Sequence, residues 1–344
     1  MSLSKTMRAM VLEEPDGPLE LREVQLPVPG EDEVLLRVRA CAVDRFDIAI
    51  RKGGIERATL PHVLGHEIAG EVSALGSGVE GWAPGDRVAT TLYLVCGECR
   101  RCKGDRETIC ENFGGHIGVN TWGGYAEYTL MPAHNLVRLP ESIDFPEASV
   151  LANAVGTPYH ALVSRMGIGE GDFLIVTGAG GGVGLHAVQI GVMRGARVMG
   201  VDIGAHKHEA ILAQGAEHAV GASALPDLAM EWTDGRGVDG VLELVGTATM
   251  PHTFASLAKG GQMVIVGSHT GTAWEIDTGL IYRKELEIRG SRNVSAAELQ
   301  TVVDLVADGK LTPIIAGTFP LEEAEALQAR VADGSAVGRE VLVP

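Results

Sequence analysis

The sequence predicts a two-domain α/β protein, in which a doubly wound parallel sheet accompanies a domain of short strands. Two sequence patterns along the chain support this prediction. Residues 7 to about 145 contain short alternating stretches such as VLLRVRA, separated by glycine and proline, which indicates strands joined by loops. From about 150 to 292 the pattern becomes strand, glycine turn, amphipathic helix and strand, which is typical of a doubly wound sheet.

The elements of the second region can be named in order. FLIVTGAG at 173–180 predicts a strand and a glycine turn, and VGLHAVQIGVMRG at 183–195 predicts a helix. ARVMGVD, DGVLELVG and GQMVIVGS predict further strands, and the last two are continuously apolar, as buried parallel strands are. TVVDLVADG and LEEAEALQARVADG predict helices, and GREVLVP at 338–344 predicts a final strand that returns to the first domain.

Composition and charge exclude several classes of protein. The formal charge of -17 argues against nucleic acid as a partner, because phosphates repel an acidic surface. No apolar run approaches the length of a membrane span, and the N-terminus MSLSKTMRAM lacks the apolar core of a signal peptide. The 46 glycines against 15 aromatic residues (4 Trp, 5 Tyr and 6 Phe) indicate many tight turns. We expect a cytoplasmic protein without a membrane segment.

A dinucleotide-binding turn is the best-supported functional motif. TGAGGGVG at 177–184 lies between an expected strand and an expected helix, where backbone N–H groups can approach a pyrophosphate. Its six-residue register is Ala179, Gly181 and Gly184, so alanine replaces the first glycine. Asp202, at the end of the next strand, is placed to accept hydrogen bonds from the ribose hydroxyls and to favour NAD over NADP. The alternative is that Asp202 only caps a turn.

Four of the five cysteines lie within 15 residues, in CGECRRCKGDRETIC. The spacing C-x2-C-x2-C with a fourth cysteine seven residues later can surround one tetrahedral ion, and charged, loop-like surroundings favour zinc over an iron–sulfur cluster. Four thiolates leave no position for substrate, so we expect a structural zinc. Its ligands would be Cys96, Cys99, Cys102 and Cys110.

The chain resembles the medium-chain dehydrogenase/reductase superfamily of the zinc alcohol dehydrogenase type. The resemblance lies in LPHVLGHEIAGEV at 60–72, PGDRV at 84–88, GGYAEY at 123–128, GVDGVLELVG, the cysteine lobe and the glycine turn. It implies a GroES-like β-barrel catalytic domain at 1–150 and 293–344, with the zinc lobe at 96–110, and an NAD-binding Rossmann domain at 151–292. It also implies hydride transfer between nicotinamide and an alcohol or carbonyl substrate, in homodimers or homotetramers.

The resemblance leaves the catalytic zinc open. The family's first cysteine ligand falls on Asp44 and its second on Asn153, while the GHE motif keeps His66 and Glu67. Asp44, His66, Glu67 and water can bind zinc, because oxygen ligands suit this ion, whereas Asn153 is a poor ligand. The alternative is a vestigial site in which Asp44 and His66 hydrogen-bond each other.

Phe46 stands where the family places a hydroxyl that takes the alcohol proton, and a phenyl ring cannot take it. An alcohol dehydrogenase would then release the proton through metal-bound water, Glu67 or Tyr159. A zinc-free enone or quinone reductase is the alternative, and Ala179 favours it. A binding protein without activity is a third hypothesis, which the nucleotide motif disfavours.

The resemblance also implies the remaining cofactor contacts. Thr157 would lie beside the nicotinamide, Lys207 near the adenine ribose and Arg339 at the pyrophosphate; the alternative for Arg339 is a solvated surface side chain. The predicted cofactor residues are Thr157, Gly181, Gly182, Val183, Gly184, Asp202, Lys207, Val245, Gly246, Gly267, Ser268 and Arg339. The predicted catalytic residues are Asp44, His66, Glu67, Asn153 and Tyr159.

Overall fold

The computed structural model describes residues 4–54, 58–271 and 273–344, so the first three residues of the N-terminal stretch considered above lie outside it. The chain forms two compact units. Unit 1 comprises Met1–Asn153 and Val294–Pro344, and unit 2 comprises Ala154–Asn293. Within the described ranges, none of the helices combines the length and the apolar character that crossing a bilayer requires.

Unit 1 is built on antiparallel strands. A three-stranded sheet has the order β2-β1-β4, and a seven-stranded sheet has the order β10-β6-β5-β3-β18-β17, with β9 also paired to β3. The elements are β1 (Thr6–Leu12), β2 (Leu19–Gln25), β3 (Glu33–Val43), α1 (Arg45–Arg51), β4 (His62–Val63), β5 (Glu67–Leu75), β6 (Arg87–Thr90), β7 (Tyr93–Leu94), η1 (Cys102–Gly104), η2 (Glu107–Ile109), β8 (Gly115–His116), β9 (Tyr128–Pro132), η3 (Ala133–Asn135), β10 (Leu136–Arg138), α2 (Phe145–Ser149), the π-helical segment η4 (Leu151–Val155), α9 (Ala296–Ala307), β17 (Ile315–Pro320), η7 (Leu321–Glu323), α10 (Ala324–Asp333) and β18 (Arg339–Val343).

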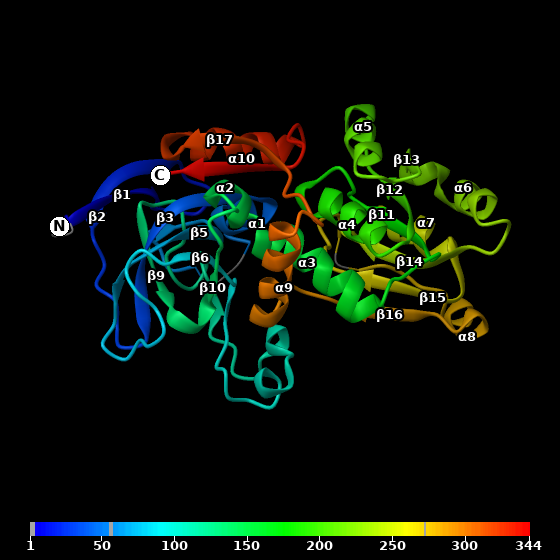
Figure 1. The fold of residues 1–344 in the computed structure, drawn as a ribbon. Helices are drawn as coiled ribbons and strands as arrows, with labels where there is room; N and C mark the ends of the chain where they lie inside the picture. The colour runs from blue at the N-terminus through cyan, green and yellow to red at the C-terminus, as the bar shows by residue number, and fades with distance from the viewer. Residues whose placement is uncertain (1–3, 55–57, 272) are drawn as a thin grey trace. The chain divides into compact units, whose positions relative to one another are not determined.

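The C-terminal strand completes the larger sheet of unit 1. β18 pairs antiparallel with β3 and parallel with β17, so the red end of the chain lies beside the blue β3 (Figure 1). Both strands are almost wholly buried, and Val341 and Leu342 of β18 pair with Ala42 and Cys41 of β3. The predicted return of the last strand to the N-terminal region is confirmed.

Unit 2 holds one parallel sheet of six strands in the order β13-β12-β11-β14-β15-β16. The central strands β11, β12 and β14 are almost wholly buried, because helices connect the strands and cover the sheet, whereas the edge strands β13 and β16 are half-buried or exposed. The elements are α3 (Gly156–Tyr159), the π-helical segment η5 (His160–Met166), β11 (Phe173–Thr177), α4 (Gly182–Met193), β12 (Arg197–Val201), α5 (Ala205–Ala213), β13 (His218–Val220), η6 (Ala222–Ala224), α6 (Leu225–Trp232), β14 (Val238–Glu243), α7 (Met250–Ala255), β15 (Leu257–Ile265), α8 (Thr278–Lys284) and β16 (Glu287–Gly290).

The predicted strands and helices of the second region are present, together with the two C-terminal helices. Several helices were not named in the sequence analysis, and two of these helical stretches carry residues that were considered there for function. One is α1, whose residues belong to the segment considered there as a metal-ligand pattern, and the other is the helical run from α2 to η5.

Candidate active site

Five polar side chains meet in unit 1 at the ends of its strands. Asp44 lies between β3 and α1, His66 and Glu67 lie at the start of β5, Asn153 lies in η4, and Arg339 is the first residue of β18. Four of these side chains are buried and Asn153 is half-buried. The structure therefore brings together four predicted catalytic residues, Asp44, His66, Glu67 and Asn153, with Arg339, which was predicted for the cofactor.

Asp44 is the N-cap of α1, which the metal-ligand interpretation of CAVDRFD overlooked. Its Oδ1 accepts hydrogen bonds from the backbone N–H groups of Phe46 (2.7 Å) and Asp47 (3.3 Å), and the Asp47 side chain completes a capping box. Its Oδ2 accepts from Asn153 Nδ2 at 3.0 Å and from Arg339 Nη2 at 3.2 Å. Both carboxylate oxygens are thus already used by N–H donors.

His66 is held from one side by a second carboxylate. Its Nδ1 donates to Asp47 Oδ1 at 2.9 Å, and Asp47 Oδ2 accepts from the hydroxyl of Tyr125 at 3.0 Å. Burial opposes protonation of the imidazole, but Asp47 and Asp44 together raise the pKa of His66 well above its usual range. Gly65 makes this placement feasible, because its φ is +98° and a Cβ there would lie 2.5 Å from the Tyr125 ring.

Glu67 and Arg339 form a buried ion pair beside the imidazole. Arg339 Nη2 lies 2.7 Å from Glu67 Oε1, and the same oxygen accepts from Asn153 Nδ2 at 2.8 Å. Burial nevertheless raises the pKa of Glu67, because it outweighs the stabilisation of the charged form by Arg339 and His66. For Asp44, burial is outweighed by His66 and Arg339, which hold its pKa well below its usual range.

The alternative in which Arg339 is a solvated surface side chain is wrong, since the residue is 8% exposed. The role of Arg339 at the pyrophosphate stays a prediction. Asp47 and Tyr125 are contributors that the sequence analysis missed. The aspartate has a sequence signal, because D-x-x-D before a helix is a capping-box spacing.

A catalytic zinc does not fit this set of donors as they are arranged. Asn153 Nδ2 lies 3.0 Å from Asp44 Oδ2, 3.3 Å from His66 Nε2 and 2.8 Å from Glu67 Oε1, at the centre of the atoms that would bind the ion. Asp44, Asp47 and His66 form a group with ligand atoms within 4.8 Å of one another. Asp47, however, faces Nδ1, whereas Asp44 faces Nε2 at 3.6 Å, so one ion cannot be bound by all three.

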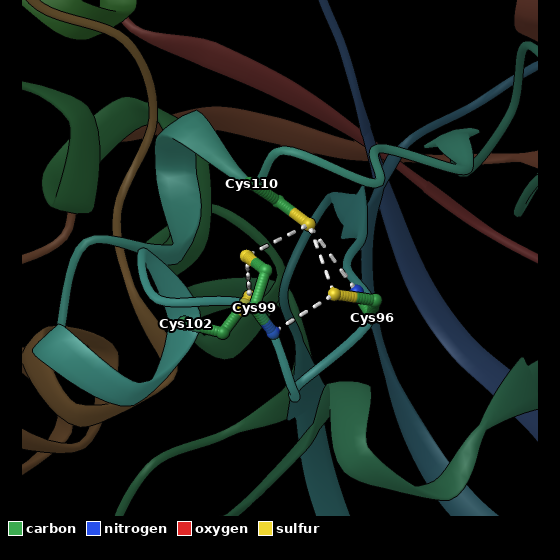
Figure 2. A group of neighbouring side chains, drawn as sticks. All are labelled: Cys96, Cys99, Cys102 and Cys110. Carbon is green, nitrogen blue, oxygen red and sulfur yellow. Dashed lines mark hydrogen bonds between the residues drawn. The ribbon is translucent and has the colours of Figure 1, made fainter.

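The four predicted structural ligands do fit a zinc ion. Figure 2 shows the sulfur atoms of Cys96, Cys99, Cys102 and Cys110 turned toward one another. The Sγ–Sγ distances are 3.5 Å for Cys99–Cys102, 3.9 Å for Cys99–Cys110 and 3.5 Å for Cys110–Cys96. A tetrahedron of sulfurs at ~2.3 Å from zinc has edges of about 3.8 Å. All five cysteines are free thiols, so no disulfide competes for these ligands.

Two cysteines of the lobe, Cys96 and Cys99, have lowered pKa values that favour the thiolate, whereas burial and the neighbouring cysteines raise the pKa of Cys102 to about 12. The backbone N–H of Glu111 points at Cys99 Sγ at 3.5 Å, and this contact with those of neighbouring backbone groups lowers the pKa of Cys99 to about 6. The four cysteines can therefore hold a structural zinc.

Aromatic side chains line the neighbourhood of His66, a feature the sequence analysis did not anticipate beyond Phe46. The Phe46 ring lies edge-on to His66, with centroids 5.4 Å apart, and 5.5 Å from His116. Tyr93 and Phe113 each pack edge-on against His116, at 4.8 and 5.1 Å. These side chains give the polar cluster an apolar border.

The predicted cofactor turn lies in unit 2 between β11 and α4. Gly184 permits a close approach of the helix to the turn, because a Cβ there would lie 2.2 Å from the carbonyl oxygen of Gly178. Asp202 follows β12 and accepts from the backbone N–H of Gly180 at 2.8 Å and of Ile203 at 2.7 Å. Lys207 Nζ lies 3.5 Å from Asp202. Asp202 therefore caps the glycine turn. Its hydrogen bonds to a ribose stay a prediction.

The other predicted cofactor residues of unit 2 follow the parallel strands or lie in helices. Val245 and Gly246 follow β14, and Gly267 and Ser268 follow β15, at the edge where ligands bind in open α/β sheets. Gly181 is the N-cap of α4, and Gly182 and Val183 are its first two residues. Thr157 is buried in α3, and Tyr159, predicted to be catalytic, is half-buried in the same helix.

Comparisons with known proteins agree with these features. The alcohol dehydrogenase GroES-like domain family matches residues 30–141, and the zinc-binding dehydrogenase family matches residues 182–308. An acryloyl-coenzyme A reductase of Metallosphaera sedula is 32% identical over 337 residues, covering 98% of this chain and 99% of the relative. An NAD-dependent alcohol dehydrogenase of Saccharolobus solfataricus is 33% identical over 350 residues, covering 98% and 100%.

Among solved structures, AibC superposes with a TM-score of 0.94 at 36% identity, covering 99% of this chain and 96% of that one. The two units thus hold a GroES-like domain and a Rossmann-type sheet, with a cysteine cluster suited to structural zinc. The chain belongs to the zinc-type alcohol dehydrogenase family of medium-chain dehydrogenases/reductases, and it is an oxidoreductase.

Proposed function

We propose that this enzyme reduces an electron-poor carbon–carbon double bond with NADH and does so without a catalytic zinc. The nicotinamide hydride, with its electron pair, goes to the carbon β to a carbonyl, and the double-bond electrons move to the carbonyl oxygen as an enolate. The α-carbon then takes a proton, ultimately from solvent. NADH is oxidised to NAD and the double bond is reduced, so atoms and electrons balance.

The hydrogen bonding of Asn153 carries the proposal. Its Nδ2 lies between one oxygen of Asp44 and one oxygen of Glu67, and these oxygens accept but cannot donate while ionised. If the side-chain amide of Asn153 were rotated by a half turn, its carbonyl oxygen would lie about 3 Å from Asp44 Oδ2 and Glu67 Oε1. Two acceptors repel each other at that distance. The N–H donors of Asn153, together with Arg339, therefore satisfy the carboxylates that a catalytic zinc would need as ligands.

The chemistry of the substrate follows from this arrangement. Oxidation of an alcohol requires a group that lowers the pKa of its hydroxyl, which a Lewis-acidic metal supplies. An alkene conjugated to a carbonyl accepts a hydride without an alkoxide, so Phe46 in place of a hydroxyl is no obstacle. The relative named acryloyl-coenzyme A reductase is named for such a substrate.

The cofactor assignment belongs to the same proposal. The glycine turn with Gly181, Gly182, Val183 and Gly184 would hold the pyrophosphate, and Asp202 with Lys207 would hold the adenosine ribose. Thr157, Val245, Gly246, Gly267 and Ser268 would contact the nicotinamide half, Arg339 the pyrophosphate, and Tyr159 would lie near the reacting groups. We propose a homo-oligomer, which light scattering after gel filtration tests.

An alcohol or carbonyl substrate with zinc held by Asp44, His66 and Glu67 is the second candidate. One observation favours it: the Nδ1–H of His66 donates to Asp47, and metal-ligating histidines are oriented by carboxylates in this way. A relative of similar identity is named an NAD-dependent alcohol dehydrogenase.

Zinc content per chain separates the two candidates. We expect one zinc per chain in the wild type purified without chelators from zinc-supplemented medium. We expect the same value in His66→Gln and nearly none in Cys99→Ser, which loses a thiolate of the lobe. NADH oxidation should be observed with an α,β-unsaturated thioester or enone. Two zincs in the wild type, falling to one in His66→Gln, would reject the zinc-free proposal and favour the second candidate.

A further inference from the structure

Another buried carboxylate lies in unit 2, at the carboxyl ends of the parallel strands. Glu243 is the last residue of β14 and is fully buried. Its Oε1 lies within 2.7 Å of the hydroxyl oxygens of both Thr177 and Thr249 and accepts from the backbone N–H groups of Val245 and Gly246, each at 3.0 Å. These four donors come from the end of β11, from the loop after β14 and from the N-cap of α7.

The two oxygens of Glu243 have different surroundings. Oε1 has the four donors, whereas Oε2 accepts from the hydroxyl of Thr253 at 3.2 Å. The Thr253 hydroxyl also lies within hydrogen-bond distance of two carbonyl oxygens of α7, so it does not depend on Glu243. Glu243 therefore holds the surrounding backbone through Oε1, to which the four donors are bound.

The loop that Glu243 holds connects three neighbouring strands. The carbonyl oxygen of Val245 accepts from the backbone N–H groups of His269 (2.9 Å) and Thr270 (3.1 Å) in the segment after β15. On the other side, the Thr177 hydroxyl accepts from the N–H of Leu244 at 2.8 Å. The carboxyl ends of β11, β14 and β15, which are adjacent in the sheet, are thus joined through one loop.

We propose that Glu243 is a positioning residue for the cofactor, which fixes the loop at Val245 and Gly246 without touching the dinucleotide. This inference rests on the proposed contacts of these two residues with the nicotinamide half of NADH. Ligands of open α/β sheets bind at the carboxyl ends of the strands, where this loop lies. A loop that must be ordered on binding weakens affinity, and a loop already ordered does not.

The asymmetry of the carboxylate gives a sharp prediction for substitutions. Glutamine can keep its carbonyl oxygen at the Oε1 position and turn its amide toward Thr253, so Glu243→Gln should bind NADH within about threefold of the wild type. Thr249→Val and Thr177→Val each remove one donor and should raise the Kd of NADH by about three- to tenfold. Glu243→Met removes the acceptor and should raise it by at least about thirtyfold.

The experiment is a titration of the full-length protein with NADH, followed by fluorescence, with each variant's melting temperature measured separately. Thr253→Val is the matched control: it removes a buried hydroxyl at the Oε2 side and should leave the Kd within about twofold of the wild-type value. If Glu243→Met does not fold, Thr249→Val and Thr177→Val decide the matter.

Three outcomes would overturn the proposal. Lower melting temperatures with an unchanged Kd in the Thr249, Thr177 and Glu243→Met variants would mean that Glu243 only stabilises the fold. An equal loss of affinity in Thr253→Val would mean that any change in this core weakens binding. Failure of the wild type to bind NADH would instead reject the cofactor assignment, and the positioning role with it.

Discussion

At the scale of the residue, the buried charges of unit 1 depend on one another. Arg339 is close to both Asp44 and Glu67, and a guanidinium removed from water requires such partners. The buried carboxylates of Asp44 and Glu67 in turn require a cation close by. Loss of one member therefore costs more than the pair itself contributes to the free energy of unfolding.

We predict that Arg339→Met lowers the free energy of unfolding by about 3–5 kcal/mol, because it removes the guanidinium that neutralises Glu67 and, together with His66, Asp44. Adding Glu67→Gln should restore part of the loss, since the amide carries no charge. Urea unfolding measures both. The control is Arg283→Met, which breaks an exposed pair with Asp277 and should cost no more than about 1 kcal/mol. Strictly additive losses in the double variant would contradict the coupling.

The sequence could place the residues of this cluster but not their partners. His66 and Glu67 stand in a recognisable motif, and Asp44 falls on the position of the family's first cysteine ligand. The pairing of Arg339 with Asp44 joins positions from opposite ends of the chain, and one sequence contains no signal for such a contact. Likewise, the amide of Asn153 looks like a lost ligand in sequence, and only its distances show that it satisfies two carboxylates.

At the scale of the element, the predictions succeeded where hydrophobic periodicity decides the structure. The predicted strands and helices of unit 2 follow their patterns closely, because its central strands are buried on both faces. The run from α2 to η5 was missed, since LANAVGTPYHALV contains glycine and proline, which usually mark turns. Most of its residues are buried, so packing supports a helix that local propensity does not.

Glu217, which directly precedes β13, joins β12 and α6 and should make the stability of unit 2 depend on pH. It accepts two hydrogen bonds from Arg197, at 2.8 and 2.7 Å, and one from Trp232 at 2.8 Å, and chiefly the Arg197 bonds lower its pKa to about 2. A lowered pKa gives stability that is present above the usual value near 4.5 and is lost as the pH falls toward 2.

Glu217→Gln should therefore lower the free energy of unfolding at neutral pH, and the difference from the wild type should shrink steadily below about pH 4.5. Because the side chains are partly exposed, we expect no more than about 1 kcal/mol at pH 7. Urea unfolding at several pH values measures this difference. A difference that stays constant between pH 7 and about pH 3.5 would contradict the assignment to this carboxylate.

At the scale of the whole molecule, the two units differ in how the chain builds them. Unit 2 is one continuous segment with its own apolar cluster, which includes Ile175, Met199, Val241 and Leu257. Unit 1 is assembled from two segments that are separated in the chain by all of unit 2. The resemblance to a known family indicated this interruption, whereas composition alone did not.

We predict that residues 154–293, produced alone, fold cooperatively and bind NADH. A segment of about 140 residues is long enough to bury a stable core, and its six strands need no partner from unit 1. Circular dichroism during thermal unfolding and a titration with NADH test this. A broad, non-cooperative transition would contradict the independence of unit 2.

Because unit 1 is built from two separated segments, its larger sheet cannot be completed until the end of the chain has been synthesised. Asp44 and Glu67 are synthesised early, but Arg339 and the strand β18 that carries it follow all of unit 2. Until they emerge, Cys41, Ala42 and Val43 at the end of β3 lack a neighbour on one side and present a free edge, which is the kind of surface that aggregates or recruits chaperones. Completion of the charge cluster should therefore be among the last events in the maturation of each nascent chain.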